Sequence, residues 1–190
     1  MIKRTFFAFP LTREFVTYYE KAVYPFLSLK ELRPVKPENG HITLKFLGPT
    51  QEEIIPDILK KAEERLKGEV SFSTRLKGFG VFPNKKRARV LWLGFDDSEG
   101  KMRKIAGEVD KALERFGYKR ELRLFQPHMT IARVKKTLTP ESCERIQKKI
   151  EEKMYVEKIK IDMITFFESV LTPQGPNYNT LYRIPLELMS

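Results

Sequence analysis

His41-Ile42-Thr43-Leu44 and His128-Met129-Thr130-Ile131 are two copies of one pattern, in which a histidine and a threonine alternate with apolar residues. The two copies contain both histidines of the 190-residue chain. Alternation with a period of two is typical of a β-strand with one buried face, because successive side chains point to opposite faces. The pattern therefore predicts two strands in which histidine and threonine share one face. Because the only two imidazoles occupy matched positions, we expect the fold to bring them together.

The composition is that of a globular protein, with 41% hydrophobic residues and a formal net charge of +11. Such a charge fits a polyanionic partner, and it equally fits a solvated, lysine-rich surface. The single cysteine, Cys143, excludes an intrachain disulfide and suits a reducing compartment. No apolar run approaches the ~18 residues of a membrane span, and the apolar start of the chain is too short for a signal peptide. We therefore expect a cytoplasmic, monomeric protein that does not contact a membrane.

Periodicity predicts strands and helices that alternate along the chain. Strands are expected at residues 2–9, 41–48, 70–76, 88–95, 159–167 and 180–188 and at the second histidine motif. Helix starts are expected at Thr12, at the capping-box pattern of residues 50–53, at Asp97 or Ser98, and at Thr139. Residues 78–80, Gly-Phe-Gly, are expected to break a strand. Interspersed helices and strands indicate an α+β or mixed α/β protein, and each motif strand is followed by a helix and then a strand, as a diverged duplication would give.

Strand parity also suggests roles for the neighbours of the two motifs. Lys45 shares parity with His41, so it is a candidate for substrate contact or a solvated edge lysine, whereas Phe46 is expected in the core. Arg133 is a candidate for phosphate binding, but its parity is opposite to that of His128, so a structural salt bridge is an equal alternative unless a β-bulge re-aims it. Tyr178 either borders the space between the two motifs or packs in a loop. A basic cluster in the loop before residue 90 could bind the phosphates of a polyanion weakly; it consists of Lys85, Lys86, Arg87 and Arg89.

Two imidazoles that face one cavity are suited to acid–base chemistry. One neutral ring takes a proton from the nucleophile, and the other, protonated, gives one to the leaving group. Thr43 and Thr130 lie on the same faces, where their hydroxyls could donate to an anionic oxygen. Paired donors around one centre fit a phosphodiester better than an acyl group. Two histidines without suitably spaced carboxylates or cysteines make a weak zinc site, so we expect no metal and no other cofactor.

The two motifs resemble the paired His-x-Thr-x signatures of the two-histidine (2H) phosphoesterase superfamily. Within it, the chain is similar to the bacterial and archaeal RNA 2′,3′-cyclic phosphodiesterases, historically called 2′-5′ RNA ligases. The similarity extends over nearly the whole chain and includes residues 4–9, 39–48, 80–83, 127–134 and 169–176. It implies an α+β fold in which residues 1–190 form one two-lobed domain, with two pseudo-symmetric antiparallel sheets, outer helices and a central cleft.

The resemblance also implies roles for individual residues. His41 would be the general acid and His128 the general base that activates water. The cyclic phosphate of the substrate would open to leave a 2′-phosphate. Thr43, Thr130, Arg133, Lys45 and Tyr178 are the candidate substrate-binding residues. The expected partner is RNA with a 2′,3′-cyclic phosphate end, tRNA fragments included.

Two other functions stay open at this point. The first is a ligase that joins RNA ends through a 2′-5′ bond by the reverse of the same chemistry. The second is a non-catalytic RNA-binding module that uses a basic face and strand aromatics.

Overall fold

The computed structural model describes residues 1–173 and 175–188, and their strands form antiparallel sheets. The first sheet has the order β10-β9-β1-β3 and the second the order β2-β7-β6-β5, while β4 and β8 form a two-stranded sheet. The strands of the first sheet are β1 (Ile2–Pro10), β3 (His41–Gln51), β9 (Met163–Thr172) and β10 (Gly175–Pro185). Those of the second are β2 (Leu32–Pro34), β5 (Leu76–Phe82), β6 (Val90–Phe95) and β7 (His128–Val134). The remaining pair is β4 (Phe72–Thr74) and β8 (Ile159–Ile161).

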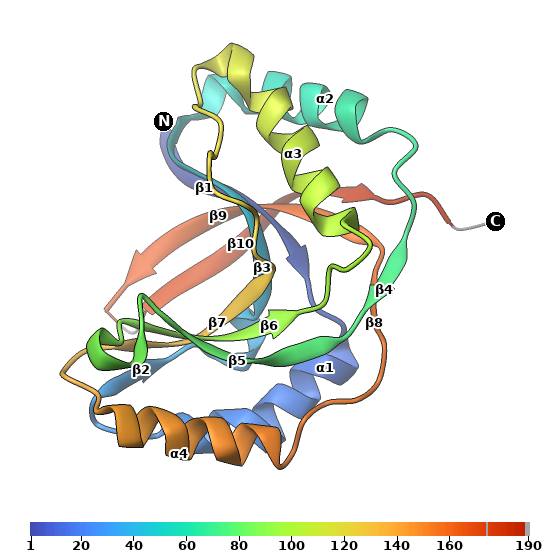
Figure 1. The fold of residues 1–190 in the computed structure, drawn as a ribbon. Helices are drawn as coiled ribbons and strands as arrows, with labels where there is room; N and C mark the ends of the chain where they lie inside the picture. Colours follow the sequence, from blue (N-terminus) through green and yellow to red (C-terminus); the bar gives the residue numbers. More distant parts are fainter. Residues whose placement is uncertain (174, 189–190) are drawn as a thin grey trace.

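Helices cover the two ends of the molecule. They are α1 (Arg13–Tyr18), α2 (Ile55–Leu66), α3 (Lys101–Leu113) and α4 (Pro140–Glu151), and α1 continues as a π-helical turn over Tyr19–Val23. Figure 1 shows α2 and α3 together at one end and α1 and α4 at the other, with the strands between them. Among the described helices, none combines the length and the apolar character needed to cross a membrane. The expected α+β fold with two antiparallel sheets and outer helices is confirmed.

The helix starts test the capping predictions one by one. The hydroxyls of Thr12 and Thr139 accept hydrogen bonds from the first turns of α1 and α4, as expected. The predicted capping box at residues 50–53 is wrong, because the Thr50 hydroxyl instead bonds to that of Thr5 at 2.7 Å and β3 extends to Gln51. Helix α2 begins at Ile55, which places Pro56 in the first turn, where its missing N–H removes no helical hydrogen bond.

The prediction for Phe46 is also wrong, because β3 is bulged. In the pairing with β1, residues 44 and 47 of β3 have no partner, and each skip reverses the side-chain parity. Phe46 is therefore 47% exposed and stacks on Phe6 at a ring distance of 5.5 Å. Lys45 turns to the opposite face, where its Nζ lies 2.5 Å from Asp110 Oδ1 of α3 and donates to the Lys119 carbonyl oxygen at 2.7 Å.

The predicted strand break at residues 78–80 does not occur, since these residues lie inside β5. Gly80 pairs with Trp92 of β6, and a Cβ at Gly80 would lie 2.1 Å from the indole ring. The glycine therefore makes room for an aromatic ring that lies across the strand.

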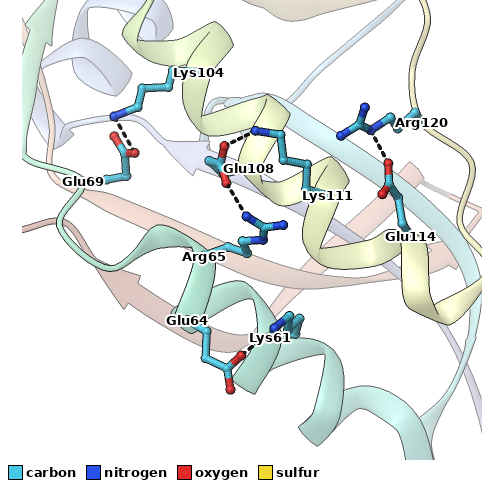
Figure 2. Close-up of polar contacts among 9 residues, drawn as sticks. All are labelled: Lys61, Glu64, Arg65, Glu69, Lys104, Glu108, Lys111, Glu114 and Arg120. Atoms are coloured by element: carbon cyan, nitrogen blue, oxygen red, sulfur yellow. Dashed lines mark hydrogen bonds and ion pairs between the residues drawn. The ribbon is translucent and has the colours of Figure 1, made fainter.

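Ion pairs surround the two helices that cover the first sheet, and one of them joins α2 directly to α3 (Figure 2). Arg65 of α2 and Lys111 of α3 both contact the Glu108 carboxylate, at 3.6 and 2.5 Å, and Lys104 lies 2.8 Å from Glu69. Exposed pairs contribute little one at a time, and we take the buried apolar faces of α2 and α3 as the main source of stability at this end.

Candidate active site

A cleft of about 870 Å³ is lined by both histidine motifs. His41 and Thr43 enter it from β3, and His128 and Thr130 enter it from β7, while the apolar residues between them are buried on the other side of each strand. The strand pattern thus predicts the correct face for both motifs. The expectation that the fold brings the two imidazoles together is met in the geometry.

Both imidazole rings are held in the same way. Nδ1 of His41 lies 2.8 Å from the carbonyl oxygen of Asn39, and Nδ1 of His128 lies 2.8 Å from that of Gln126, in each case two residues earlier. A carbonyl oxygen can only accept, so Nδ1 carries the proton in both rings. Nε2 is then the nitrogen that remains to exchange protons with a ligand.

The backbone of the two motifs is also irregular at matching positions. In the pairing of β7 with β6, Ile131 is skipped, just as residue 44 is skipped in β3. Each motif therefore has a bulge directly after its threonine. This match between the two lobes agrees with a diverged duplication, and it is invisible in the sequence beyond the four-residue motifs.

His41 lies in an aromatic surrounding. Its ring centroid lies 4.9 Å from that of Phe6 and 5.0 Å from that of Tyr178. The pKa of His41 is lowered from its usual value near 6.5 to about 4, mainly by burial. The hydrogen bond to Asn39 raises the pKa, whereas the charges of His128 and Arg133 lower it further. Without a ligand, His41 is therefore neutral at pH 7.

This environment predicts a pH-dependent contribution to stability. Between pH 6.5 and 4 the unfolded chain protonates His41 and the folded chain does not, so the free energy of unfolding falls as the pH falls through this window. Relative to the His41→Gln variant, the wild type is expected to lose roughly 1–3 kcal/mol between pH 7 and pH 4. Urea unfolding of both proteins at several pH values measures the difference, in which the carboxylates common to both cancel. Parallel curves would contradict the low pKa.

His128 rests on a different pair of aromatic rings. Its centroid lies 5.2 Å from that of Phe82 and 5.9 Å from that of Trp92, and both rings meet it edge to face. Trp92 is opposite Thr130 in the sheet, so the two side chains share the cleft face. Sequence reasoning did not single out Trp92, although its status as the only tryptophan of the chain was visible.

The remaining candidate residues differ in how they meet the cleft. Thr43 and Thr130 line it, and neither hydroxyl has a hydrogen-bond partner within residues 1–173 and 175–188. The bulge at Ile131 does re-aim Arg133, which is exposed, lines the cleft and lies close enough to lower the pKa of His41. Tyr178 also lines the cleft, and burial raises the pKa of its hydroxyl, which therefore stays protonated.

Asn39 is a positioning residue that the sequence analysis missed. Its carbonyl oxygen holds the His41 ring, and its side-chain amide donates to the carbonyl oxygen of Pro176 at 2.9 Å. It thereby joins the start of β3 to β10, two residues before Tyr178. A polar residue two positions before the histidine was the only signal in the sequence.

The described residues contain no group of three His, Cys, Asp or Glu side chains that could hold a metal ion. The donor set of the cleft is two imidazoles, two threonine hydroxyls and several basic side chains. These groups match an anion better than a cation.

Comparison with known proteins places the chain in a family. A family model described as the 2′-5′ RNA ligase superfamily matches residues 28–169. Proteins named RNA 2′,3′-cyclic phosphodiesterase are 33% identical over 154 residues in Aeropyrum pernix and 36% identical over 153 residues in Thermotoga maritima. Each alignment covers 80% of this chain, and they cover 85% and 79% of these relatives.

The chain belongs to the 2′-5′ RNA ligase superfamily. The resemblance read from the two motifs is thereby confirmed. A solved structure from Thermus thermophilus superposes with a TM-score of 0.80 at 26% identity and covers 98% of this chain and all of its own. The structure of E. coli LigT complexed with 3′-AMP has a TM-score of 0.77 at 22% identity and covers 98% of this chain and 99% of its own. The two-lobed arrangement is therefore the fold of this superfamily.

Proposed function

We propose that this protein hydrolyses the 2′,3′-cyclic phosphodiester end of RNA to a 2′-phosphate by general acid–base catalysis with two histidines and no metal ion. The observation that carries the proposal is the matched pair of imidazoles in one cleft, each fixed through Nδ1 to a backbone carbonyl. The names of the relatives, which are 30–36% identical to this chain, support the same reaction class.

The reaction can be followed atom by atom. His128 Nε2 takes a proton from water, whose oxygen attacks the phosphorus, and the bond from phosphorus to the 3′-oxygen breaks. His41 gives its Nε2 proton to the departing 3′-oxygen, which leaves a 3′-hydroxyl and a 2′-phosphate. Thr43, Thr130 and Arg133 donate to the phosphoryl oxygens, where negative charge develops. The assignment of acid and base follows the family resemblance.

The low pKa of His41 has a direct consequence for this mechanism. A general acid must carry its proton at the start of the reaction, whereas the unliganded His41 is neutral at pH 7. An anionic phosphate next to the ring favours the imidazolium form and raises the pKa. We infer that substrate binding itself, by placing the phosphate at His41, supplies the conditions under which this ring is protonated.

We also propose that residues 1–190 act as one domain and as a monomer, in the cytoplasm, on RNA ends that include tRNA fragments. The first point is supported by interlocked lobes: α3 follows β6 of the second sheet but contacts β3 of the first. One hydrophobic cluster extends through both lobes. We assign Lys45 no direct substrate contact, because Asp110 and Lys119 already engage its ammonium group.

The test is incubation with an oligoribonucleotide that ends in a 2′,3′-cyclic phosphate, in the presence of EDTA. We expect a product with a 2′-phosphate and a free 3′-hydroxyl. Such a product is resistant to enzymes that require a 3′-phosphate, whereas a 3′-phosphate product is sensitive to them. A second RNA with a 5′-hydroxyl in the same reaction measures 2′-5′ ligation, which we expect to be the minor reaction in water. Loss of turnover in EDTA, or a 3′-phosphate product, would contradict the proposal.

A further inference from the structure

The cleft is strongly basic beyond the two histidine motifs. Six lysine or arginine residues line it, against one carboxylate, Glu121. Lys45 borders the cleft, but its ammonium group contacts Asp110 on the other face of β3. The other five have no ion-pair partner within the described part of the chain; they are Arg33, Lys36, Arg89, Arg123 and Arg133. This excess of unneutralised positive charge in a concave site favours a ligand with more than one negative charge.

Three of these residues form an arginine row (Arg33, Arg89 and Arg133): Arg33 lies on β2, Arg133 on β7 and Arg89 directly before β6. Arg33 of β2 lies directly opposite Arg133 of β7, so their side chains share the cleft face. Arg133 in turn lies opposite Val90 of β6, and Arg89 is the residue before it. Like charges directly opposite one another destabilise a sheet. A bound anion removes this repulsion, and an arginine guanidinium is well suited to phosphate.

Which phosphate the arginine row can bind depends on its position relative to the reacting phosphate. Because Ile131 is bulged, the segment from Thr130 to Arg133 spans only two residues of β6, which is about 7 Å along the strand. Arg133 still influences His41 and therefore lies at the edge of the reaction centre. Arg33 on β2 and Arg89, which directly precedes β6 and accepts a hydrogen bond from the Val134 N–H of β7, flank Arg133, so the row extends the site to either side of β7.

The chemistry of the substrate fixes which phosphate is available. A 2′,3′-cyclic phosphate occupies the 3′ end of an RNA strand, so the rest of the strand leaves the terminal ribose through its 5′-oxygen. The next negative charge is therefore the phosphate on the 5′ side of the terminal nucleotide. The cleft, at about 870 Å³, is near the upper end of the ~300–1,000 Å³ found for small-molecule sites.

We propose that Arg33 and Arg89 bind the phosphate on the 5′ side of the terminal nucleotide, so that the protein selects an RNA strand of two or more nucleotides over a cyclic mononucleotide. This inference rests on the proposed function and names its substrate class. The basic cluster expected from the sequence at residues 85–89 is thereby divided. Arg89 reaches the cleft, whereas Lys85 lies 3.7 Å from Glu144 of α4.

The test compares two substrates with the same terminal base, a 2′,3′-cyclic mononucleotide and a hexaribonucleotide with a 2′,3′-cyclic phosphate. In Arg33→Gln and Arg89→Gln, kcat/KM for the hexamer should fall by about 5–10-fold each, which corresponds to about 1–1.4 kcal/mol for each lost contact with a phosphate. The value for the mononucleotide should stay within about twofold of the wild type. The dependence of hexamer binding on salt should also weaken, by about one unit of slope per lost phosphate contact.

Arg103→Gln on α3 is the matched control, because Arg103 is exposed and does not line the cleft. It should leave both substrates unaffected. A second measurement, independent of turnover, determines how each substitution changes the dissociation constants of two ligands. The ligands are a hexamer with a 2′-phosphate end and the corresponding nucleoside 2′-monophosphate. An equal loss on both ligands, or no loss on the hexamer, overturns the inference while hydrolysis still supports the proposed function. If no substrate is hydrolysed, the proposed function fails and the binding comparison still decides the role of the two arginines.

Discussion

Replacing either histidine by alanine is expected to lower kcat by about 10²–10⁴-fold on a 2′,3′-cyclic phosphate substrate, because each removes one of the two proton transfers. The variants are expected to remain folded, since both side chains face the cleft. Turnover is measured in EDTA, and circular dichroism with thermal unfolding verifies the fold.

The combination of the two changes makes this experiment sharper. Groups that act as a unit show strongly non-additive effects, so His41→Ala with His128→Ala should cost little more than the worse single variant. Arg103→Gln, away from the cleft, serves here too as the surface control. Wild-type turnover in either single variant would refute the paired mechanism. So would additive losses, because they would indicate two imidazoles that act in separate steps or at separate places.

Much of the site could be predicted because its signal is local. The alternation in each motif gives the strand and the face of the histidine and threonine. That the two rings meet could be predicted only from the count, because both histidines of the chain occupy matched positions. Periodicity contains no information on which distant strands approach each other, and here the resemblance to a known family supplied the bilobal arrangement.

The wrong predictions on side-chain orientation share a physical cause. A bulge depends on how a strand pairs with its neighbour, so it leaves no trace in the alternation of one strand. The bulges of β3 turn Lys45 away from the face of His41 and bring Phe46 to that face. The bulge of β7 turns Arg133 to the face of His128, which a regular strand would not allow. The glycine at position 80 was misread for a similar reason: its lack of a side chain serves a ring on the next strand.

Gly80→Ala is also expected to have a large effect, because Gly80 lies against the indole ring of Trp92. The new methyl group would lie 2.1 Å from Trp92, so the indole must move. Overpacking of this kind typically costs about 1–3 kcal/mol of stability. Trp92 also contacts Phe82 and His128, with ring distances of 5.0 and 5.9 Å. Because a displacement of about 1 Å at a catalytic group can cost up to ~10²-fold in rate, we expect kcat to fall by about 10–10²-fold.

The matched control is Gly107→Ala in α3, where an added Cβ meets nothing within 4 Å. The same chemical change should there stabilise the protein by about 0.5–1 kcal/mol, since glycine disfavours a helix interior, and leave kcat unchanged. A double-mutant cycle then isolates the cause. If the clash with the indole is responsible, Gly80→Ala should cost less than about 0.5 kcal/mol in a Trp92→Leu background, with a coupling free energy above that value. An equal cost in both backgrounds would mean that the backbone of β5, and not the ring beneath His128, requires glycine at this position.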